Sequence, residues 1–251
     1  MFAEERRQQI VDLLRSAGQV RTRELSERFG VSEVTIRTDL DNLDDRELLK
    51  KTHGGAIALP QSAPDAAFDR RMQSNADAKH RIGRMAAQQL VNSQSVIFDS
   101  GSTTMHIAMH MPQLRHVMVA TPAMNIAQML MDRPGLDVHM LGGRVDASTV
   151  STLVGPQQMD GLLAHQVFMA AHAIDSSFDI VDQSEDVARS KRNLMQMARR
   201  VVLVVDSTKW DVGGPSKAFP LSRVDLVITD SGLPAPIRKR LRDRNIDVLF
   251  A

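Results

Sequence analysis

Short apolar runs that alternate with helical stretches are the feature that most constrains the fold of this chain. Six runs have strand character, and they cover residues 96–98, 117–120, 138–141, 201–205, 226–229 and 248–250. Strands that alternate with helices form a largely parallel sheet covered by helices, because each crossover between parallel strands needs a helix-sized connection. The sequence therefore predicts an α/β fold for its larger part, residues 75–251.

A second, smaller pattern precedes the α/β region. Apolar residues recur at helical spacing in the first segment, and Gly18 follows where a left-handed C-terminal cap belongs. We expect Thr22 to cap a short second helix, Gly30 to form a tight turn, and Ser32 to cap a third helix. Two short helices across a glycine corner are typical of a helix-turn-helix.

The segment after the third helix predicts a wing and then a linker. The run LKKTHGGAIAL has a β-like beginning, a Gly-Gly pair at Gly54 and Gly55, and a second apolar part, which favours a hairpin. Residues 58–74 are rich in Pro, Ala, Ser and Asp, which indicates a linker. We thus predict a winged helix-turn-helix in residues 1–57, a linker in 58–74 and the α/β domain in 75–251.

The predicted third helix and the wing present polar side chains of the kind that contact DNA. Residues 1–57 contain ten Lys and Arg against eleven Asp and Glu, so the net charge of this segment does not favour DNA binding. The argument for DNA binding therefore depends on where the cations lie. Arginine can grip guanine bidentately, and wing lysines can contact the backbone. The candidate DNA-binding residues are Ser32, Glu33, Thr35, Arg37, Thr38, Lys50, Lys51 and His53. The alternative is three helices that serve only protein contacts.

A polar motif after the first strand of the α/β region predicts an anion site. The run DSGSTT, Asp99 to Thr104, follows the apolar residues 96–98 and precedes a helix. Backbone N–H groups and hydroxyls at a helix N-terminus bind phosphate well. The motif lacks the Lys-Ser/Thr pair of a Walker A loop, which disfavours hydrolysis of a nucleoside triphosphate. The alternative is an ordinary strand-to-helix turn.

Two parts of the chain resemble the DeoR family of bacterial sugar-catabolism repressors. The first part carries ERRQQIVDLL, FGVSEVTIRTDL and HGGA, although the family usually has a second arginine where this chain has Thr38. The second part carries DSGSTT, TPAMNIAQML, LGGRV, AID, ARSKRNLM and VVDSTKW in family order. This resemblance implies a Rossmann-like sensor domain similar to ribose-5-phosphate isomerase, which binds a phosphorylated sugar without converting it.

The resemblance also implies which residues hold the effector. Ser102, Thr103 and Thr104 would bind phosphate, Asp99 and Asp175 sugar hydroxyls, and Lys191 would supply the countercharge. The complete candidate set is Asp99, Ser100, Gly101, Ser102, Thr103, Thr104, Thr121, Gly142, Gly143, Asp175, Lys191 and Lys209. Each has a plainer alternative, such as Asp99 bracing its loop, Lys191 as a solvated charge, or Lys209 on the surface.

Three departures from the family pattern accompany these residues. Ala171, His172 and Ala173 precede Asp175 where the family has glycines, and Phe178 stands in place of an Asp-Gly turn. His172 could donate to the sugar or be a packed, hydrogen-bonded residue. Val187 stands where a carboxylate often precedes the helix lysine by four residues. These departures suggest an unusual effector.

The sequence thus predicts a sequence-specific transcriptional repressor of a carbohydrate catabolic operon that a phosphorylated sugar releases from its operator. The alternatives are an active sugar-phosphate isomerase with an accessory DNA-binding domain, or a scaffold. We expect no enzyme activity, no cofactor and no metal. The absence of cysteine excludes disulfides, and the charged start MFAEERRQQI does not resemble a signal peptide. We therefore expect a cytoplasmic homo-oligomer, a dimer or tetramer, with no membrane partner.

Overall fold

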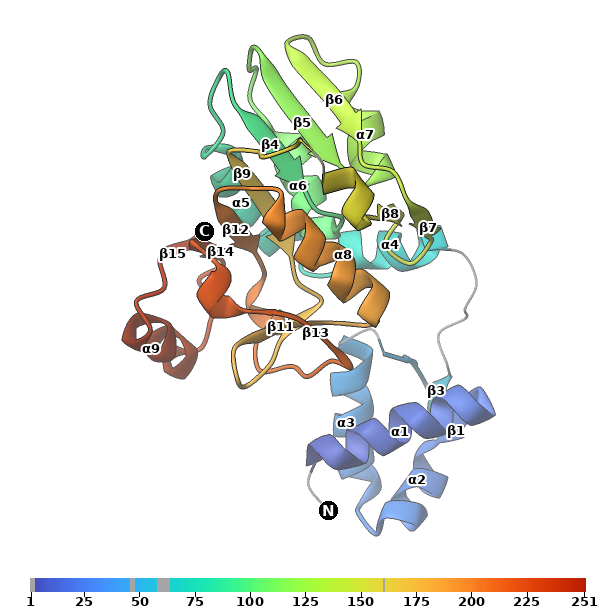
Figure 1. The fold of residues 1–251 in the computed structure, drawn as a ribbon. Coiled ribbons are helices and arrows are strands. Elements are labelled where there is room, and N and C mark those ends of the chain that lie inside the picture. The colour runs from blue at the N-terminus through green and yellow to red at the C-terminus, as the bar shows by residue number, and fades with distance from the viewer. Residues whose placement is uncertain (1–2, 46–47, 58–63, 160) are drawn as a thin grey trace. The chain divides into compact units, whose positions relative to one another are not determined.

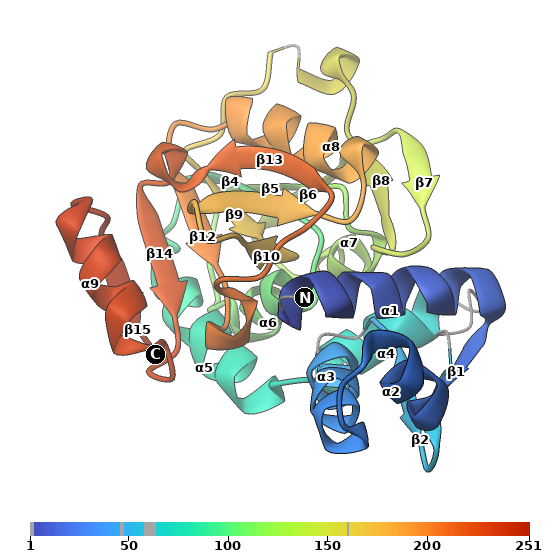
Figure 2. The same cartoon turned by 90° about the horizontal axis from the view of Figure 1, so that it is seen from below.

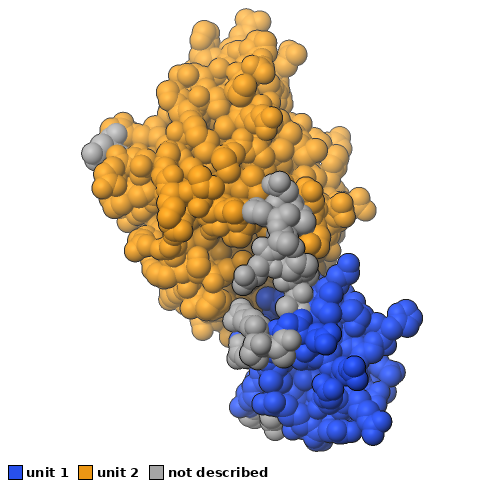
Figure 3. All heavy atoms as spheres, turned by 90° about the vertical axis from the view of Figure 1, so that its right-hand side faces the viewer, with its two compact units in different colours: residues 1–63 blue, residues 64–251 orange. Residues whose placement is uncertain are grey.

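The computed structural model describes residues 3–45, 48–57, 64–159 and 161–251. The chain divides into two compact units, Met1–Ala63 and Pro64–Ala251, which Figure 3 draws in separate colours. Residues 58–63 of the predicted linker lie outside the described residues, and the second half of that segment forms a helix, α4 (Pro64–Gln73). We describe each unit by itself.

Unit 1 is a three-helix bundle with a small sheet, as predicted for a winged helix-turn-helix. Its core consists of apolar residues from all three helices, among them Ile10, Leu14, Leu25, Ile36 and Leu40. The three antiparallel strands pair in the order β1-β3-β2. The elements are α1 (Ala3–Ala17), β1 (Gln19–Arg21), α2 (Thr22–Phe29), α3 (Glu33–Asp45), β2 (Lys50–Thr52) and β3 (Gly55–Ile57).

The predicted helix ends of unit 1 are confirmed at three positions. Gly18 and Gly30 follow α1 and α2 with φ of 75° and 64°, the left-handed conformation that glycine adopts without steric cost. Ser32 precedes α3, and its hydroxyl accepts a hydrogen bond from the backbone N–H of Thr35 at 3.2 Å. This is the expected N-terminal cap of the recognition helix.

Two local predictions in unit 1 are wrong in detail. Thr22 is a buried residue inside α2, not its cap; Arg21 precedes the helix, and no side chain caps this end. The backbone N–H of Thr22 donates instead to the carbonyl of Gly54 at 2.9 Å, which ties α2 to the wing. Gly55 lies in β3, not in the turn. A Cβ there would meet the carbonyl oxygen of Val20 at 2.0 Å, so the pairing of β3 with β1 requires glycine at this position.

Unit 2 is built on a seven-stranded, all-parallel sheet in the order β15-β14-β12-β9-β4-β5-β6 (Figure 1). Six of these strands are those predicted. They are β4 (Ser95–Phe98), β5 (Val117–Thr121), β6 (Leu136–Met140), β12 (Val201–Val204), β14 (Leu226–Thr229) and β15 (Val248–Phe250). The central strand β9 (Gln166–Ala170) is not among the six, although it pairs with both β4 and β12.

Helices cover both faces of this sheet (Figure 2). On one face, α5, α6 and α7 pack through Ile82, Ile107 and Ile126. On the other face, α8 and α9 pack through Leu194 and Ile237. The bounds are α5 (Ala76–Ala87), α6 (Ser102–His110), α7 (Met124–Leu130), α8 (Glu185–Gln196) and α9 (Ala235–Asp243).

Two antiparallel additions complete unit 2. A three-stranded sheet in the order β10-β11-β13 contributes to the same core as α8. A hairpin of β7 and β8 follows the edge strand β6. The bounds are β7 (Arg144–Asp146), β8 (Ser151–Leu153), β10 (Ala173–Ile174), β11 (Asp179–Asp182) and β13 (Ser216–Pro220). Three short 3-10 helices are η1 (Pro156–Met159), η2 (Ser207–Lys209) and η3 (Leu221–Arg223).

The sheet order places a topological switch point between β4 and β9. From β4 the chain adds β5 and β6 on one side, and from β9 it adds β12, β14 and β15 on the other. In open α/β sheets, ligands bind at the carboxyl ends of the strands at such a point, because the connections there leave in opposite directions. The fold therefore directs attention to the segments that follow β4 and β9.

Candidate DNA-reading face and effector site

The recognition helix α3 presents its polar residues to solvent. Ile36, Leu40 and Leu43 face the core of unit 1. The Arg37 side chain is 60% exposed and forms an ion pair with Glu33, one turn earlier, at 3.1 Å. The Thr38 hydroxyl donates to the carbonyl of its own helix at Val34. An exposed ion pair of this kind contributes little to stability, so Arg37 can exchange Glu33 for a base or phosphate at low cost.

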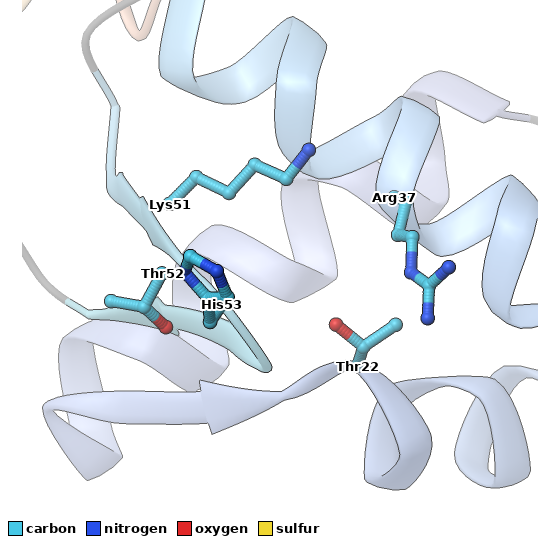
Figure 4. Close-up of a pocket in the computed structure, with 5 residues that line it drawn as sticks. All are labelled: Thr22, Arg37, Lys51, Thr52 and His53. Atoms are coloured by element: carbon cyan, nitrogen blue, oxygen red, sulfur yellow. The ribbon is translucent and has the colours of Figure 1, made fainter.

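An open groove separates α3 from the wing (Figure 4). It has a volume of about 440 Å³ and is lined by Thr22, Arg37, Lys51, Thr52 and His53. Figure 4 shows Arg37 on one side, the three wing residues on the other and Thr22 between them. The groove brings together the predicted DNA-binding residues Arg37, Lys51 and His53.

The two wing lysines differ in their partners. The ammonium of Lys51 forms an ion pair with Asp41 of α3, and its backbone N–H donates to Asp44 at 3.1 Å. Lys50 is exposed, and the structure records no ion pair for it with any described residue. Lys50 is therefore the wing cation that can reach a phosphate without first leaving a carboxylate.

A buried ion-pair cluster that sequence reasoning missed fixes α3 against α1. Asp39 lies in the middle of α3, and its side chain is 2% exposed. Arg6 Nε lies 2.6 Å from Asp39 Oδ2, and Arg7 Nε lies 2.9 Å from Asp39 Oδ1. The spacing of Asp39 three residues after the core residue Ile36 could have placed it on the inward side of the helix.

At the switch point of unit 2, the DSGSTT motif forms the turn from β4 into α6. Gly101 has φ of 155°, and a Cβ at this position would meet the Cβ of Ala170, at the end of β9, at 2.9 Å. Helix α6 begins at Ser102, with no side-chain cap at Gly101. The first N–H groups of this helix thus have no side-chain acceptor, as an anion site requires.

The three hydroxyls of the motif have different roles in the structure. Thr104 is fully buried, and its hydroxyl donates to the carbonyl of Gly101 at 2.9 Å. For the hydroxyls of Ser102 and Thr103, the structure gives no hydrogen-bond partner among the described residues. Thr104 therefore braces the turn, and Ser102 and Thr103 retain donors for a ligand.

Asp99 and Lys191, which sequence reasoning assigned to the effector, contact each other. Lys191 Nζ lies 2.5 Å from Asp99 Oδ2 and 3.7 Å from the carboxylate of Asp182, and it donates to the carbonyl of Ala170 at 2.7 Å. All three charged side chains are buried. Asp99 Oδ2 also accepts the backbone N–H of Ala170 at 3.2 Å.

This cluster changes the electrostatics of its members. Burial raises the pKa of Asp99, and the neighbouring Lys191 opposes that shift. Burial alone would lower the pKa of Lys191, but the carboxylates of Asp99 and Asp182 outweigh it, and the pKa of Lys191 is raised. Lys191 therefore stays protonated, and the carboxylates of Asp99 and Asp182 already balance its charge. Asp182 of β11 is a site residue that sequence reasoning missed.

Of four other predicted effector residues, three have internal roles. The Thr121 hydroxyl joins β5 to β4 by donating to the carbonyl of Phe98 at 2.8 Å. Gly142 is exposed, and Gly143 admits Leu153 of β8, whose carbonyl oxygen a Cβ would meet at 2.1 Å. Asp175 Oδ1 accepts two backbone N–H groups in the turn between β10 and β11. Their assignment to the effector remains a prediction.

The end of β12 adds a carboxylate and a cation near the switch point. Asp206 is buried; its Oδ1 accepts the N–H and hydroxyl of Thr208, and its Oδ2 has no hydrogen-bond partner among the described residues. Lys209 is half-buried. Burial lowers the pKa of His172 to about 4, with further contributions from Lys209, Arg71 and Lys191.

The chain combines a winged helix-turn-helix with a separate α/β unit that has an uncapped helix N-terminus at its switch point. These two parts define a regulator with a DNA-reading domain, called here the reading head, and a sensor domain. Two family models match these parts: the DeoR-like helix-turn-helix domain at residues 6–62 and the DeoR C terminal sensor domain at residues 74–231. The chain belongs to the DeoR family of transcriptional regulators.

Relatives match over nearly the whole chain. The chain is 31% identical over 251 residues to a putative aga operon transcriptional repressor of Escherichia coli O157:H7, with 98% of this chain and 93% of the relative covered. It is 29% identical to the glycerol-3-phosphate regulon repressor of Escherichia coli K12, with 95% of each covered. It is 28% identical to the transcriptional repressor GlcR of Bacillus subtilis 168, with 98% and 95% covered.

Solved structures overlap with parts of the chain. Ribose 5-phosphate isomerase A from Methanocaldococcus jannaschii has a TM-score of 0.41 and 14% identity, with 55% of each chain covered. A transcriptional regulator from Streptococcus pneumoniae TIGR4 has a TM-score of 0.40 and 10% identity, with 66% of this chain and 86% of that chain covered. In the part of the chain that the structure describes, no helix is long and apolar enough to cross a membrane.

Proposed function

We propose that the protein is a sequence-specific transcriptional repressor of a carbohydrate catabolic operon and that a phosphorylated sugar or sugar derivative releases it from its operator. The observation that carries the sensing half is the start of α6, where an uncapped helix N-terminus and the unpartnered hydroxyls of Ser102 and Thr103 come together. The names of the relatives, repressors of the aga operon and the glycerol-3-phosphate regulon, support the same class of function.

The reading half of the proposal rests on α3 and the wing. Arg37 and Thr38 read base edges, Ser32, Glu33 and Thr35 lie at the helix start, and Lys50, Lys51 and His53 contact the adjacent backbone. Operators for such readers consist of paired half-sites, so the protein acts as a homo-oligomer, in the cytoplasm where its operator lies.

The proposal assigns the effector contacts to groups that are not already engaged with other described residues. Ser102, Thr103 and the first N–H groups of α6 bind the phosphate, and Lys209 supplies the countercharge because Lys191 is already neutralised. The free Oδ2 of Asp206 accepts a sugar hydroxyl. Asp99 and Lys191 hold the ends of β4 and β9 together and position the loop.

The same contacts argue against an isomerase. A catalytic carboxylate needs an oxygen free to remove a proton from the substrate. Asp99 Oδ2 is occupied by Lys191 and by the N–H of Ala170. These contacts give Asp99 a structural role, and the relatives that are named as repressors support binding without turnover at this site.

Replacement of Thr103 by Asp tests the sensing half. The added carboxylate repels phosphate, so calorimetry with a panel of sugar phosphates should show effector binding at least about tenfold weaker, equivalent to about 1.4 kcal/mol. Gel shifts should show operator binding that no longer responds to the effector, which is a super-repressor. Thr103→Asn is the matched control, because it has nearly the same shape as Asp and no charge.

Three outcomes would contradict the proposal. Native effector affinity in Thr103→Asp would make the DSGSTT loop a structural turn only. An equal loss of effector affinity in Thr103→Asn would show that the shape of the new side chain, and not its charge, weakens binding. Steady aldose-ketose interconversion by the wild-type protein would replace the sensor with an enzyme.

A further inference from the structure

Three histidines meet between α5 and α6 on the face of the sheet opposite α8. His80 lies on α5, and His106 and His110 lie four residues apart on α6, which places both on one side of that helix. One ring nitrogen from each of the three lies within 4.8 Å of the others. This cluster is not part of the proposed effector site, since it lies along α6 beyond its first turn.

A glycine brings the two helices together at this cluster. A Cβ at Gly83 of α5 would meet the backbone carbon and the Cβ of His106 at 2.6 Å, so only glycine fits at this crossing. His80 lies one turn before Gly83 on the same helix. The packing of α5 on α6 therefore holds His80 beside the two histidines of α6.

The contacts within the cluster do not account for all three rings. His110 Nε2 and His80 Nδ1 lie 3.0 Å apart, which a hydrogen bond between neutral imidazoles explains. His106 is 6% exposed, and both of its ring nitrogens are buried without a hydrogen-bond partner among the described residues. A buried imidazole without a hydrogen-bond partner destabilises the fold. Coordination of an ion by His106 together with His80 and His110 would remove that cost.

The geometry points to a site for a divalent transition-metal ion, Zn²⁺ in particular, bound by His80, His106 and His110. Tetrahedral Zn²⁺ with Zn–N bonds of about 2.0–2.1 Å needs ligand nitrogens roughly 3.3 Å apart, and small side-chain rotations achieve this from the present separations. Three imidazoles without a carboxylate favour Zn²⁺, Ni²⁺ or Cu²⁺ over Mg²⁺ and Ca²⁺. His80 is exposed and His110 half-buried, so the ion can enter from solvent and keep water as its fourth ligand.

The protonation of the cluster is compatible with this assignment. Burial lowers the pKa of His106 to about 4, with further contributions from Lys79, His110 and His80. Burial also lowers the pKa of His110, with contributions from His80 and Arg84. Neutral imidazole is the form that binds metal. The ammonium of Lys79 donates to the carbonyls of Arg71 and Ser74.

Metal analysis of the full chain tests the site. The protein is prepared without a histidine tag, loaded with Zn²⁺ and dialysed, and bound zinc is measured by mass spectrometry. We expect one zinc per wild-type chain. His80→Gln and His110→Gln should each bind Zn²⁺ at least about tenfold more weakly, because loss of a ligand costs no less than loss of its supporting partner. Both residues are partly solvent-exposed, so circular dichroism should show an intact fold.

His139→Gln is the matched control, because His139 is an exposed histidine beside Asp137 on β6. It should retain one zinc. Since the sequence has no cysteine, visible bands of bound Co²⁺ report histidine coordination directly, and they should disappear in His80→Gln and His110→Gln. Zn²⁺ should also raise the melting temperature of the wild type and of His139→Gln only. No retained zinc in the wild type, or equal retention in all four proteins, would overturn the assignment.

Discussion

Asp39 illustrates how one residue decides the geometry of the reading head. It is a carboxylate in the recognition helix, yet it faces the core and receives one arginine on each oxygen. Burial of an unpaired charge is costly, so Arg6 and Arg7 compensate Asp39 and in doing so fix α1 against α3. The position of the reading face thus depends on a polar contact inside unit 1.

Asp39→Ala should lower the free energy of unfolding of unit 1 by about 3–5 kcal/mol, because the buried Arg6 and the half-buried Arg7 lose the carboxylate that they share. Asp41→Ala is the control: it lies on the same helix, is exposed, and should change stability by less than about 1 kcal/mol. Urea unfolding followed by circular dichroism reports both units, and the fluorescence of Trp210, the only tryptophan, reports unit 2. Equal stability of the two variants would show that the buried pairs contribute nothing.

Arg37→Ala should weaken operator binding by about 1–3 kcal/mol without unfolding unit 1, because the side chain is exposed and, under the proposed function, contacts a base. Arg23→Ala is the matched control, since Arg23 on α2 forms the same kind of one-turn ion pair with Glu27. Gel shifts on the operator and on a scrambled duplex distinguish the loss of a base contact from the loss of a phosphate contact. If Arg37→Ala weakens both duplexes equally, Arg37 contacts phosphate instead of a base.

Residue roles were predictable from the sequence where they depend on near neighbours. Ser32, Gly18 and Gly30 act within a few residues of themselves, and the sequence identified all three. Asp99 and Lys191 lie 92 residues apart in the chain, and only the fold shows that each neutralises the other. The family resemblance implies that both contact the effector, and residue types alone do not distinguish a buried ion pair from a pair that binds a ligand.

At the scale of elements, the wing combines Lys51, which is paired with Asp41, and Lys50, which has no ion pair with a described residue. Lys50→Ala should lower the salt slope of DNA binding by about one, because a phosphate contact releases its counterion. Lys51→Ala should lower it less, since Asp41 already neutralises Lys51. Asp41→Ala should free Lys51 and strengthen binding to every duplex. Titrations by fluorescence anisotropy at several salt concentrations check all three, and equal slopes for the two lysine variants would contradict this view of the wing.

The turn between β10 and β11 explains one departure from the family pattern. Phe178 has φ of 66°, the conformation that glycine adopts most easily, and yet it is buried. The guanidinium groups of Arg240 and Arg244 lie 4.1 and 4.5 Å from its ring centre, and Trp210 packs edge-on at 5.8 Å. These contacts offset the strained backbone, so an aromatic residue can replace glycine here.

Elements were predictable where their pattern is local and long enough. The six predicted strands have apolar runs bounded by polar residues, and the sheet contains all of them. Strand β1 has only three residues, Gln19–Arg21, and exists because β3 pairs with it from 34 or more residues away. Strand β9 lies in the middle of the sheet, buried on both faces, and only His172 separates its apolar run, residues 167–171, from the next apolar residues, 173–174.

At the scale of the molecule, stability should depend on pH through His172. Its pKa is about 4 in the folded protein against 6.5 when unfolded, so below 6.5 the unfolded state binds more protons. The free energy of unfolding of unit 2 should therefore fall as pH decreases from about 6.5 to about 4, by on the order of 1–3 kcal/mol. His172→Gln should lose this part of the dependence. The measurement is urea unfolding by Trp210 fluorescence at several pH values, and identical pH profiles for the two proteins would contradict it.

Each compact unit is one unbroken stretch of chain with a core of its own, and a single short segment connects them. A single genetic crossover within the codons for residues 58–63 would therefore exchange a complete reading head without cutting through either core. Under the proposed function, the recombinant would answer the same metabolite at a different set of promoters. New pairings of promoter and metabolite could then arise in this family by exchange of whole domains. No recombinant protein would have to repack a hydrophobic core.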